Sequence, residues 1–122
     1  MESTILILFI LLALKHFLAD FVFQTNRMVM EKGTYGAKWG IYHSLVHAVL
    51  TGLIFYAVFT DFVSVILLAF IDGVVHYHID WAKMNINKNR NLTPADNAFW
   101  FWLGIDQLMH YLTYIGLIAL AI

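Results

Sequence analysis

The sequence has no cysteine and few charged residues, and each shortage excludes a class of protein. With no cysteine among 122 residues, a disulfide framework and a thiolate metal site are both excluded. Only 12% of the residues are charged, against about a quarter in soluble domains. The net charge of −1 is not the basic footprint of a nucleic-acid-binding protein. Hydrophobic residues make up 61% of the chain, and the mean hydropathy is +0.75. A chain this short has too little interior to bury so much apolar surface, which indicates lipid surroundings.

Four apolar stretches predict four membrane-spanning helices, because each has about the 20 residues needed to cross a hydrocarbon core. We expect these helices at residues 3–24, 39–59, 62–83 and 94–122. The first stretch begins after Glu2 and contains Lys15 and His16, which argues for a retained helix rather than a signal peptide. No repeat or linker divides the chain. We therefore predict an all-α, integral membrane, antiparallel four-helix bundle that forms one transmembrane domain over residues 1–122.

The connecting segments give the expected helix ends and the orientation. Thr60–Asp61 predicts a tight turn, and Thr93, Pro94 and Asp96 predict a capped helix start. Apart from Lys15, every lysine and arginine lies in or beside the first and third connections, at Arg27, Lys32, Lys38, Lys83, Lys88 and Arg90. All four tryptophans lie beside these basic segments, as an aromatic belt would: Trp39, Trp81, Trp100 and Trp102. The positive-inside rule then predicts cytoplasmic basic loops and extracytoplasmic termini, in a bacterial inner membrane or a phage-infected host membrane.

The apolar stretches also carry acids and imidazoles, spaced four residues apart within each helix. They are His16 and Asp20, His43 and His47, Asp72, His76 and Asp80, and Asp106 and His110. A spacing of four places the members of each set on one helix face. At a rise of about 1.5 Å per residue, all nine fall in the half of the bundle nearer the basic loops.

These nine side chains predict an intramembrane metal site. One charged Asp at the bilayer centre costs about 2.5–3.5 kcal/mol, so several must face one another and be neutralised. Imidazole and carboxylate ligands without sulfur suit zinc, with manganese, iron or magnesium as alternatives. Catalytic zinc usually takes three protein ligands, so nine candidates indicate two ions or one ion with supporting residues.

The segments that carry these residues resemble a known family. The stretches KHFLADFVFQT, HSLVHA, DGVVHYHIDWAK and DQLMH are similar to the motifs of small phage and bacterial membrane proteins called domain of unknown function 3307. The resemblance spans essentially the whole chain. That family is similar to predicted membrane-bound metal-dependent hydrolases, so the resemblance implies a hydrolase by analogy. The positions that match its pattern are the nine residues above, with Lys83 and Gln107.

Individual roles follow as expectations. Asp72 or Asp106 would act as general base, and Lys83 would bind an anionic substrate or form a salt bridge to Asp80. Gln107 would contact the substrate or orient a ligand. His78 lies two positions from His76 and so points to nearly the opposite face, which favours a structural role. Lys15 would extend to the interface or pair with a neighbouring acid.

The leading hypothesis is a metal-dependent hydrolase that acts on a lipid-linked or phosphorylated substrate at the cytoplasmic side. The alternatives are a non-catalytic phage-type effector that binds a host membrane protein, and a proton or cation conductor. Simple polar adhesion between helices is the fourth interpretation. The sequence leaves open whether the chain forms a homo-oligomer.

Overall fold

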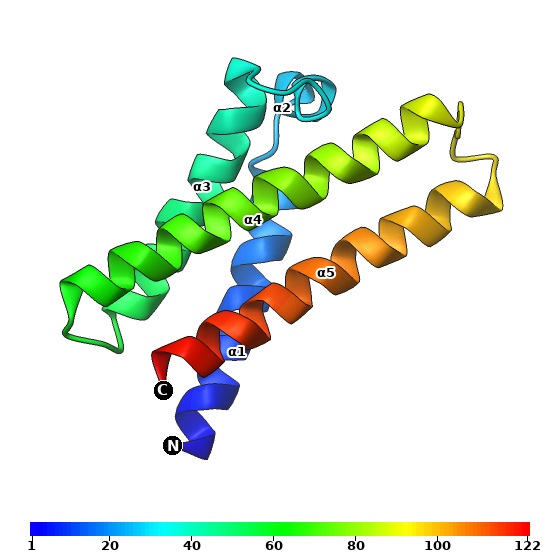
Figure 1. Cartoon of the computed structure of the whole chain (residues 1–122). Coiled ribbons are helices and arrows are strands. Elements are labelled where there is room, and N and C mark those ends of the chain that lie inside the picture. Colours follow the sequence, from blue (N-terminus) through cyan, green and yellow to red (C-terminus); the bar gives the residue numbers. More distant parts are fainter.

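The structure, a computed structural model, describes every residue from Met1 to Ile122 and is helical throughout, without strands. Helix α1 (Glu2–Phe17) continues into one π-helical turn, η1 (Leu18–Val22), and is followed by α2 (Asn26–Glu31), α3 (Lys38–Tyr56), α4 (Phe62–Asn89) and α5 (Asn97–Ala121). Both termini lie at one end of the molecule, and α2 and the α4–α5 loop lie at the other (Figure 1).

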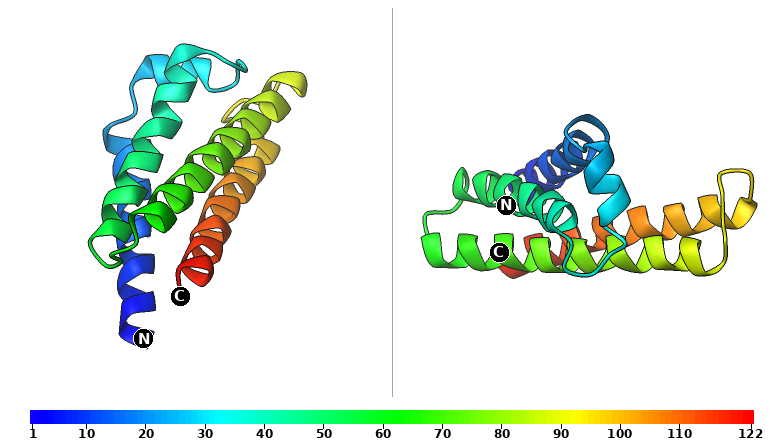
Figure 2. Two further views of the ribbon diagram at one scale, coloured as in Figure 1. Left: turned by 60° about the vertical axis from the view of Figure 1, so that its left-hand side comes forward. Right: turned by 90° about the horizontal axis from the view of Figure 1, so that it is seen from above.

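The four long helices pack in a closed ring. α1 contacts α3 and α5, and α4 contacts the same two helices from the other side. Consecutive long helices run in opposite directions (Figure 2). The closest packing is between α3 and α4, where a Cβ atom at Gly73 would lie only 3.0 Å from the Cβ of Ala48. Each of the four helices turns one face toward the middle of the ring, where the buried side chains pack together.

The surface of this ring is apolar and much of its interior is polar. Thirteen of the 24 buried residues are polar or charged, whereas large apolar side chains along every long helix are exposed. A soluble protein has the opposite distribution. Three helical segments are long and apolar enough to cross a membrane, namely Glu2–Val22, Phe62–Asn89 and Asn97–Ala121. The structure thus agrees with an all-α membrane protein, while α3, which carries His43 and His47, is not among these three candidates.

Several helix ends differ from the predicted ones. The first helix stops at Val22, and residues 26–31, expected to form a loop, make the short helix α2. The third long helix continues to Asn89, six residues beyond its predicted end. It stops because Asn91 adopts a φ of 52°, and Leu92 N–H then donates to Asn87 O at 2.8 Å in a Schellman motif.

The predicted start of the last helix is wrong by three residues. Asp96, not Thr93, occupies the N-cap position, and Pro94 lies before the helix. The backbone N–H and the hydroxyl of Thr93 donate to Asp96 Oδ2 at 2.8 and 3.0 Å, and these bonds lower the pKa of Asp96. The predicted tight turn at Thr60–Asp61 is wrong: α3 ends at Tyr56, three residues before its predicted end, and residues 57–61 connect it to α4 with the turn at Ala57–Val58. Asp61 is the N-cap of α4. The hydroxyl of Ser64 donates to Asp61 and lowers the pKa of that carboxyl.

An apolar cluster closes the end of the ring that carries the termini. It consists of Leu8, Leu12, Phe55, Val65, Leu68, Tyr114, Leu117 and Ile118. All eight come from the halves of the long helices nearest the termini or the α3–α4 turn. The polar interior therefore lies in the middle of the molecule and toward the end with α2.

Candidate metal centre

All nine candidate ligands are buried in the middle of the ring. α1 contributes His16 and η1 Asp20; α3 contributes His43 and His47; α4 contributes Asp72, His76 and Asp80; and α5 contributes Asp106 and His110. No side chain of this set is more than 7% exposed. We call the part of the interior that these nine residues fill the polar chamber, and side chains from every long helix or its continuation meet there.

Four of the nine form one compact set of donors, Asp20, His43, His47 and His76. Their ligand atoms all lie within 4.8 Å of one another. Oδ1 of Asp20 is 2.9 Å from His47 Nε2 and 3.1 Å from His43 Nε2. Nε2 of His43 is in turn 3.3 Å from His76 Nε2. Ligands at 2.0–2.1 Å around a tetrahedral zinc ion are separated by about 3.3 Å. These three spacings are close to that value, while Asp20 Oδ1 and His76 Nε2 are 3.8 Å apart, so the set is slightly wider than such a site on one side.

Two further sets adjoin the first. His16, His76 and His110 form one, and Asp80, Asp106 and His110 form the other. Asp80 connects the first set to the last, because its Oδ2 is 3.2 Å from His43 Nε2 and its Oδ1 is 3.3 Å from His110 Nε2. A carboxylate that turns one oxygen to each set has the geometry of a bridging ligand between two ions.

Three buried atoms in the chamber have no hydrogen-bond partner, namely His76 Nδ1, Asp80 Oδ2 and Asp106 Oδ1. Asp80 Oδ2 lies 3.2 Å from Lys32 Nζ and from His43 Nε2, but neither contact has hydrogen-bond alignment. Burying an unpaired polar atom costs about 1–3 kcal/mol. Asp80 Oδ2 has the Lys32 ammonium and Asp106 Oδ1 has His110 Nε2, at 3.6 Å, within ion-pair distance, but neither oxygen accepts a hydrogen bond. Each oxygen therefore has a lone pair available to a metal ion.

Two residues of α5 hold His16 in place. Its Nδ1 lies 2.7 Å from the hydroxyl oxygen of Tyr114, and its Nε2 lies 3.0 Å from Gln107 Oε1. The amide of Gln107 also donates to Asp106 Oδ2 at 3.0 Å. Of the two predicted roles for Gln107, these contacts favour orienting candidate ligands over meeting a substrate. Tyr114 was not predicted, although it continues the spacing of four from Asp106 and His110.

Asp72 lies in the chamber but outside all three candidate metal sets. Its Oδ2 accepts hydrogen bonds from Lys15 Nζ at 2.7 Å and from Thr51 Oγ1 at 2.6 Å. Lys15 Nζ is also 3.2 Å from His47 Nδ1. Of the alternatives predicted for Lys15, the structure thus has the ion pair. These contacts favour a supporting role for Asp72 over that of ligand or base.

Two more lysines reach the chamber from the end with α2. Lys32 is 5% exposed, and its Nζ lies 3.2 Å from Asp80 Oδ2. Lys83 Nζ lies 3.9 Å from Asp106 Oδ2, so the predicted alternative of a Lys83–Asp80 pair is wrong. Lys32 takes that place because α2 and α3 pack closely: a Cβ at Gly40 would be 3.0 Å from Lys32 Cα. The sequence offered no signal for this, since Lys32 falls in a segment expected to be a loop.

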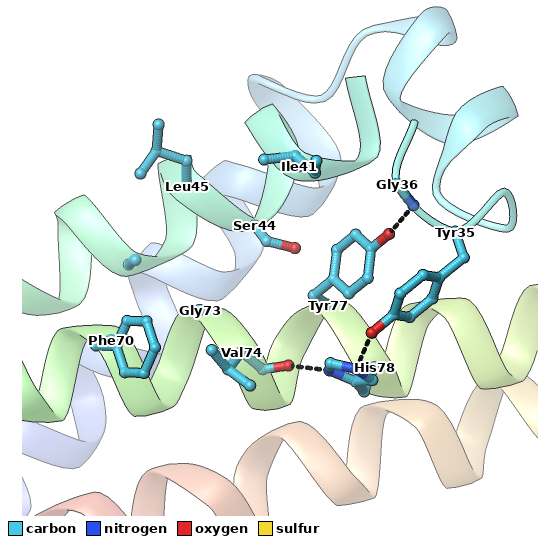
Figure 3. A pocket seen from close by; sticks show the side chains of 11 residues that line it. Tyr35, Gly36, Ile41, Ser44, Leu45, Phe70, Gly73, Val74, Tyr77 and His78 are labelled. Carbon is cyan, nitrogen blue, oxygen red and sulfur yellow. Dashed lines mark hydrogen bonds between the residues drawn. The ribbon is translucent and has the colours of Figure 1, made fainter. Parts of the chain in front are cut away.

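His78 points away from the chamber, as its spacing predicted. It lies in a largely apolar surface pocket of about 410 Å³ between α3 and α4 (Figure 3). Its Nδ1–H donates to Val74 O at 2.7 Å, and its Nε2 is 2.9 Å from the Tyr35 hydroxyl. The backbone N–H of Gly36 donates to the hydroxyl of Tyr77 nearby at 2.7 Å. These contacts anchor the segment before α3 to α4 and serve a structural purpose.

Fold and site together define a helical protein with helices suited to a membrane and buried His/Asp sets that could hold a metal ion. Residues 7–122 match the family described as protein of unknown function DUF3307, and the chain belongs to this family. No match was found among curated proteins or among solved structures. The family description names no activity, so any functional conclusion must come from the polar chamber.

Proposed function

We propose that this protein is a four-helix membrane protein whose polar chamber holds one or two divalent metal ions for hydrolysis of a lipid-linked or phosphorylated substrate. In this proposal α3 spans the membrane together with the other three long helices, because it packs between α1 and α4 in the same ring. The basic loops face the cytoplasm of a bacterium or a phage-infected host, and the termini face outward.

The convergence of Asp20, His43, His47 and His76 is the observation that carries the proposal. Three imidazole nitrogens and one carboxylate oxygen lie within 4.8 Å of one another inside a molecule whose outer surface is largely apolar. Adhesion between helices needs one or two polar contacts, each worth roughly 0.6–2 kcal/mol. Four donors aimed at one point exceed that need and match the ligand preferences of zinc.

The position of Asp80 supports a second ion. With Asp106 and His110 it forms a set rich in carboxylate, which would also accept manganese, iron or magnesium. Paired ions in hydrolytic centres are about 3.5–4 Å apart and are commonly clamped together by shared ligands. Asp80 would be the shared ligand here.

Residues of the chamber could accept a proton from a bound water and could bind an anionic substrate. When bound, a zinc ion lowers the pKa of a coordinated water to about 7 and so makes a nucleophile available at neutral pH. With a single ion in the set of Asp20, His43, His47 and His76, Asp106 is our candidate general base, because its buried Oδ1 has no hydrogen-bond partner. With a second ion bound, Asp106 would serve as its ligand instead. The chamber has four aspartates against Lys15, Lys32 and Lys83, so one divalent ion makes its formal charge positive. An anionic substrate fits that balance.

The apolar cluster argues against the conductor alternative. A path across the membrane needs polar groups along its whole length, and the cluster from Leu8 to Ile118 closes the end with the termini. The effector alternative differs in a measurable way. It expects His76→Ala to leave function intact as long as the helices still fold.

Metal analysis of the full chain, purified without a histidine tag, tests the proposal. We expect at least about one equivalent of divalent metal, with zinc most abundant. His43→Gln should lose most of that metal, whereas His78→Gln, which changes a histidine outside the chamber, should keep it. The metal-loaded protein should then hydrolyse a member of a panel of phosphorylated lipids. Wild-type protein that is folded but holds well below one equivalent would contradict the proposal.

A further inference from the structure

A pocket of mixed polar and apolar lining opens beside the chamber, at the end of the molecule that carries α2. Its volume is about 670 Å³, and its lining residues come from α2 and its flanks, from the end of α4, the α4–α5 loop and the start of α5. Figure 1 shows these elements at one end of the molecule. Lys32, Lys83 and Lys88 line it, and no acidic residue does. We call it the lysine pocket. An enclosure with three ammonium groups and no carboxylate on its wall is suited to an anion.

Two of these lysines also touch the chamber. Lys32 Nζ is 3.2 Å from Asp80 Oδ2, and Lys83 Nζ is 3.9 Å from Asp106 Oδ2. Asp80 and Asp106 belong to one candidate metal set with His110. The lysine pocket is therefore separated from that set by a single layer of side chains. An anion held by Lys32 and Lys83 would lie next to the metal ligands.

Lys32 and Lys83 could exchange their present carboxylate partners for a bound anion. If the proposed function holds, an ion at Asp80 and Asp106 would neutralise both carboxylates, so that the charges of Lys32 and Lys83 could be used to bind an anion. Lys32 Nζ would keep its hydrogen bond to Gln24 Oε1, at 2.8 Å, and Gln24 also lines the pocket. Lys88 is exposed and has no acid beside it in the pocket. All three positive charges would then be available together.

The remaining lining is partly polar and partly apolar. Asn87 lines the pocket, and its buried Oδ1 has no hydrogen-bond partner. A side-chain amide offers two N–H donors and one acceptor, so Asn87 can bond either a phosphoryl oxygen or a hydroxyl of a ligand. Met84, Phe99 and Leu103 form an apolar wall. A ligand with a charged head and an apolar tail fits this combination better than a free, fully hydrated anion.

We propose that the lysine pocket binds the phosphate-ester head group of a membrane lipid, with Lys32, Lys83 and Lys88 as its cationic partners. This inference rests on the proposed function for its place in a reaction, but head-group binding itself can be measured separately. Lysine is a point-charge donor to phosphate, and charge-assisted hydrogen bonds are among the strongest in proteins. The pocket selects the phosphate group, and the adjoining chamber is where its ester bond would be broken.

The test measures binding of a dioctanoyl phosphonate analogue of phosphatidic acid, whose C–P bond resists hydrolysis, to the full chain in detergent by native mass spectrometry. Dioctanoyl phosphatidylcholine is the comparison lipid, and inorganic phosphate is the competitor. The variants are Lys88→Gln, the double variant Lys83→Gln/Lys88→Gln, and Asn87→Asp, which adds a negative charge without changing size. The matched control is Lys38→Gln, because Lys38 is exposed and stacks over Trp39 outside the pocket. Metal content is measured on every sample.

We expect the phosphonate lipid to be preferred over phosphatidylcholine, and each pocket variant to bind it more weakly while Lys38→Gln binds as wild type. The double variant should lose about tenfold or more, since two charge-assisted bonds are removed. If inorganic phosphate displaces the lipid, the charged head group alone is sufficient for binding. If it does not, contact of the lipid tail with the apolar wall also contributes to binding. Lys88→Gln keeps the test valid if the double variant misfolds, because that side chain is exposed. Equal binding of both lipids, or unchanged binding by Lys88→Gln and Asn87→Asp, would overturn the inference. If the protein binds metal but does not prefer the phosphonate lipid, only the proposed role of the lysine pocket is contradicted. If it prefers that lipid but binds no metal, only the proposed metal centre is contradicted.

Discussion

The ammonium group of Lys15 lies 2.7 Å from Oδ2 of Asp72, and neither side chain is more than 3% exposed. On α4, Asp72 falls between Leu68 of the apolar cluster and His76 of the metal sets. The ion pair thus forms the boundary between the apolar and polar parts of the interior. The hydroxyl of Thr51 donates a second hydrogen bond to the same oxygen.

Breaking this pair should be much more costly than replacing it. Lys15→Met leaves the Asp72 carboxylate buried without its cation, and such a loss typically costs about 3–5 kcal/mol. The double variant Lys15→Met/Asp72→Leu removes both charges and should recover most of that free energy of unfolding. Unfolding in detergent, followed by circular dichroism, measures the difference. Single and double variants of equal stability would mean that the two charges are not coupled.

Tyr114 should matter for metal affinity more than for stability. Its hydroxyl oxygen, 2.7 Å from His16 Nδ1, fixes the orientation of that ring. Loss of a partner that orients a ligand typically lowers metal affinity about 10–100-fold. Tyr114→Phe should show this loss in zinc titration against a competing chelator, with circular dichroism unchanged. Tyr111→Phe is the matched control, since Tyr111 is exposed on the same helix. Equal affinities in the two variants would contradict the role assigned to Tyr114.

The close packing of α3 on α4 predicts a contrast between two glycines. A Cβ at Gly73 would lie 3.0 Å from Ala48 Cβ, whereas a Cβ at Gly104 meets nothing within 4 Å. Gly73→Leu should therefore force the helices apart and destabilise the protein by about 1–3 kcal/mol, the usual cost of overpacking. Gly104→Leu should be tolerated, because that position faces open space on α5. Thermal unfolding of the two variants side by side decides whether α3 and α4 pack as described.

Much of this arrangement could be predicted from spacing. Because acids and imidazoles recur every four residues, each set had to share one helix face, and the cost of charge in lipid turned these faces inward. That reasoning selected His16 through His110 without coordinates. It could not say which acids would pair with lysines, since that depends on how far each helix is offset along its neighbour. Asp72 is an example: it is buried as expected, but Lys15 and Thr51 both donate hydrogen bonds to its Oδ2, and it belongs to none of the candidate metal sets.

The structural features that the sequence did not predict are those in which tertiary contacts outweigh the local sequence pattern. Residues 26–31 read as a loop because six residues are too few for a recognisable pattern, yet they form α2 and carry Lys32 toward Asp80. Thr93 and Pro94 match the pattern of a helix start. In the structure, however, the backbone N–H of Thr93 donates to the Asp96 carboxylate, and the helix begins only at Asn97. In both places a side chain reaches a partner that sequence spacing does not reveal.

The absence of native cysteine makes the predicted orientation directly testable. Ser3 lies in the first turn of α1, and Asn89 is the last residue of α4, next to Lys88 of the lysine pocket. The start of α1 and the end of α4 lie at opposite ends of the molecule (Figure 2), so Ser3→Cys and Asn89→Cys report on the two sides. Because lysine and arginine concentrate at the second end, we expect it to face the cytoplasm. A membrane-impermeant maleimide should then label Ser3→Cys in cells with a permeabilised outer membrane, and Asn89→Cys only after the inner membrane is opened. The reverse pattern would place the basic loops outside, and the lysine pocket would then take its lipid from the outer leaflet rather than from the cytoplasmic one.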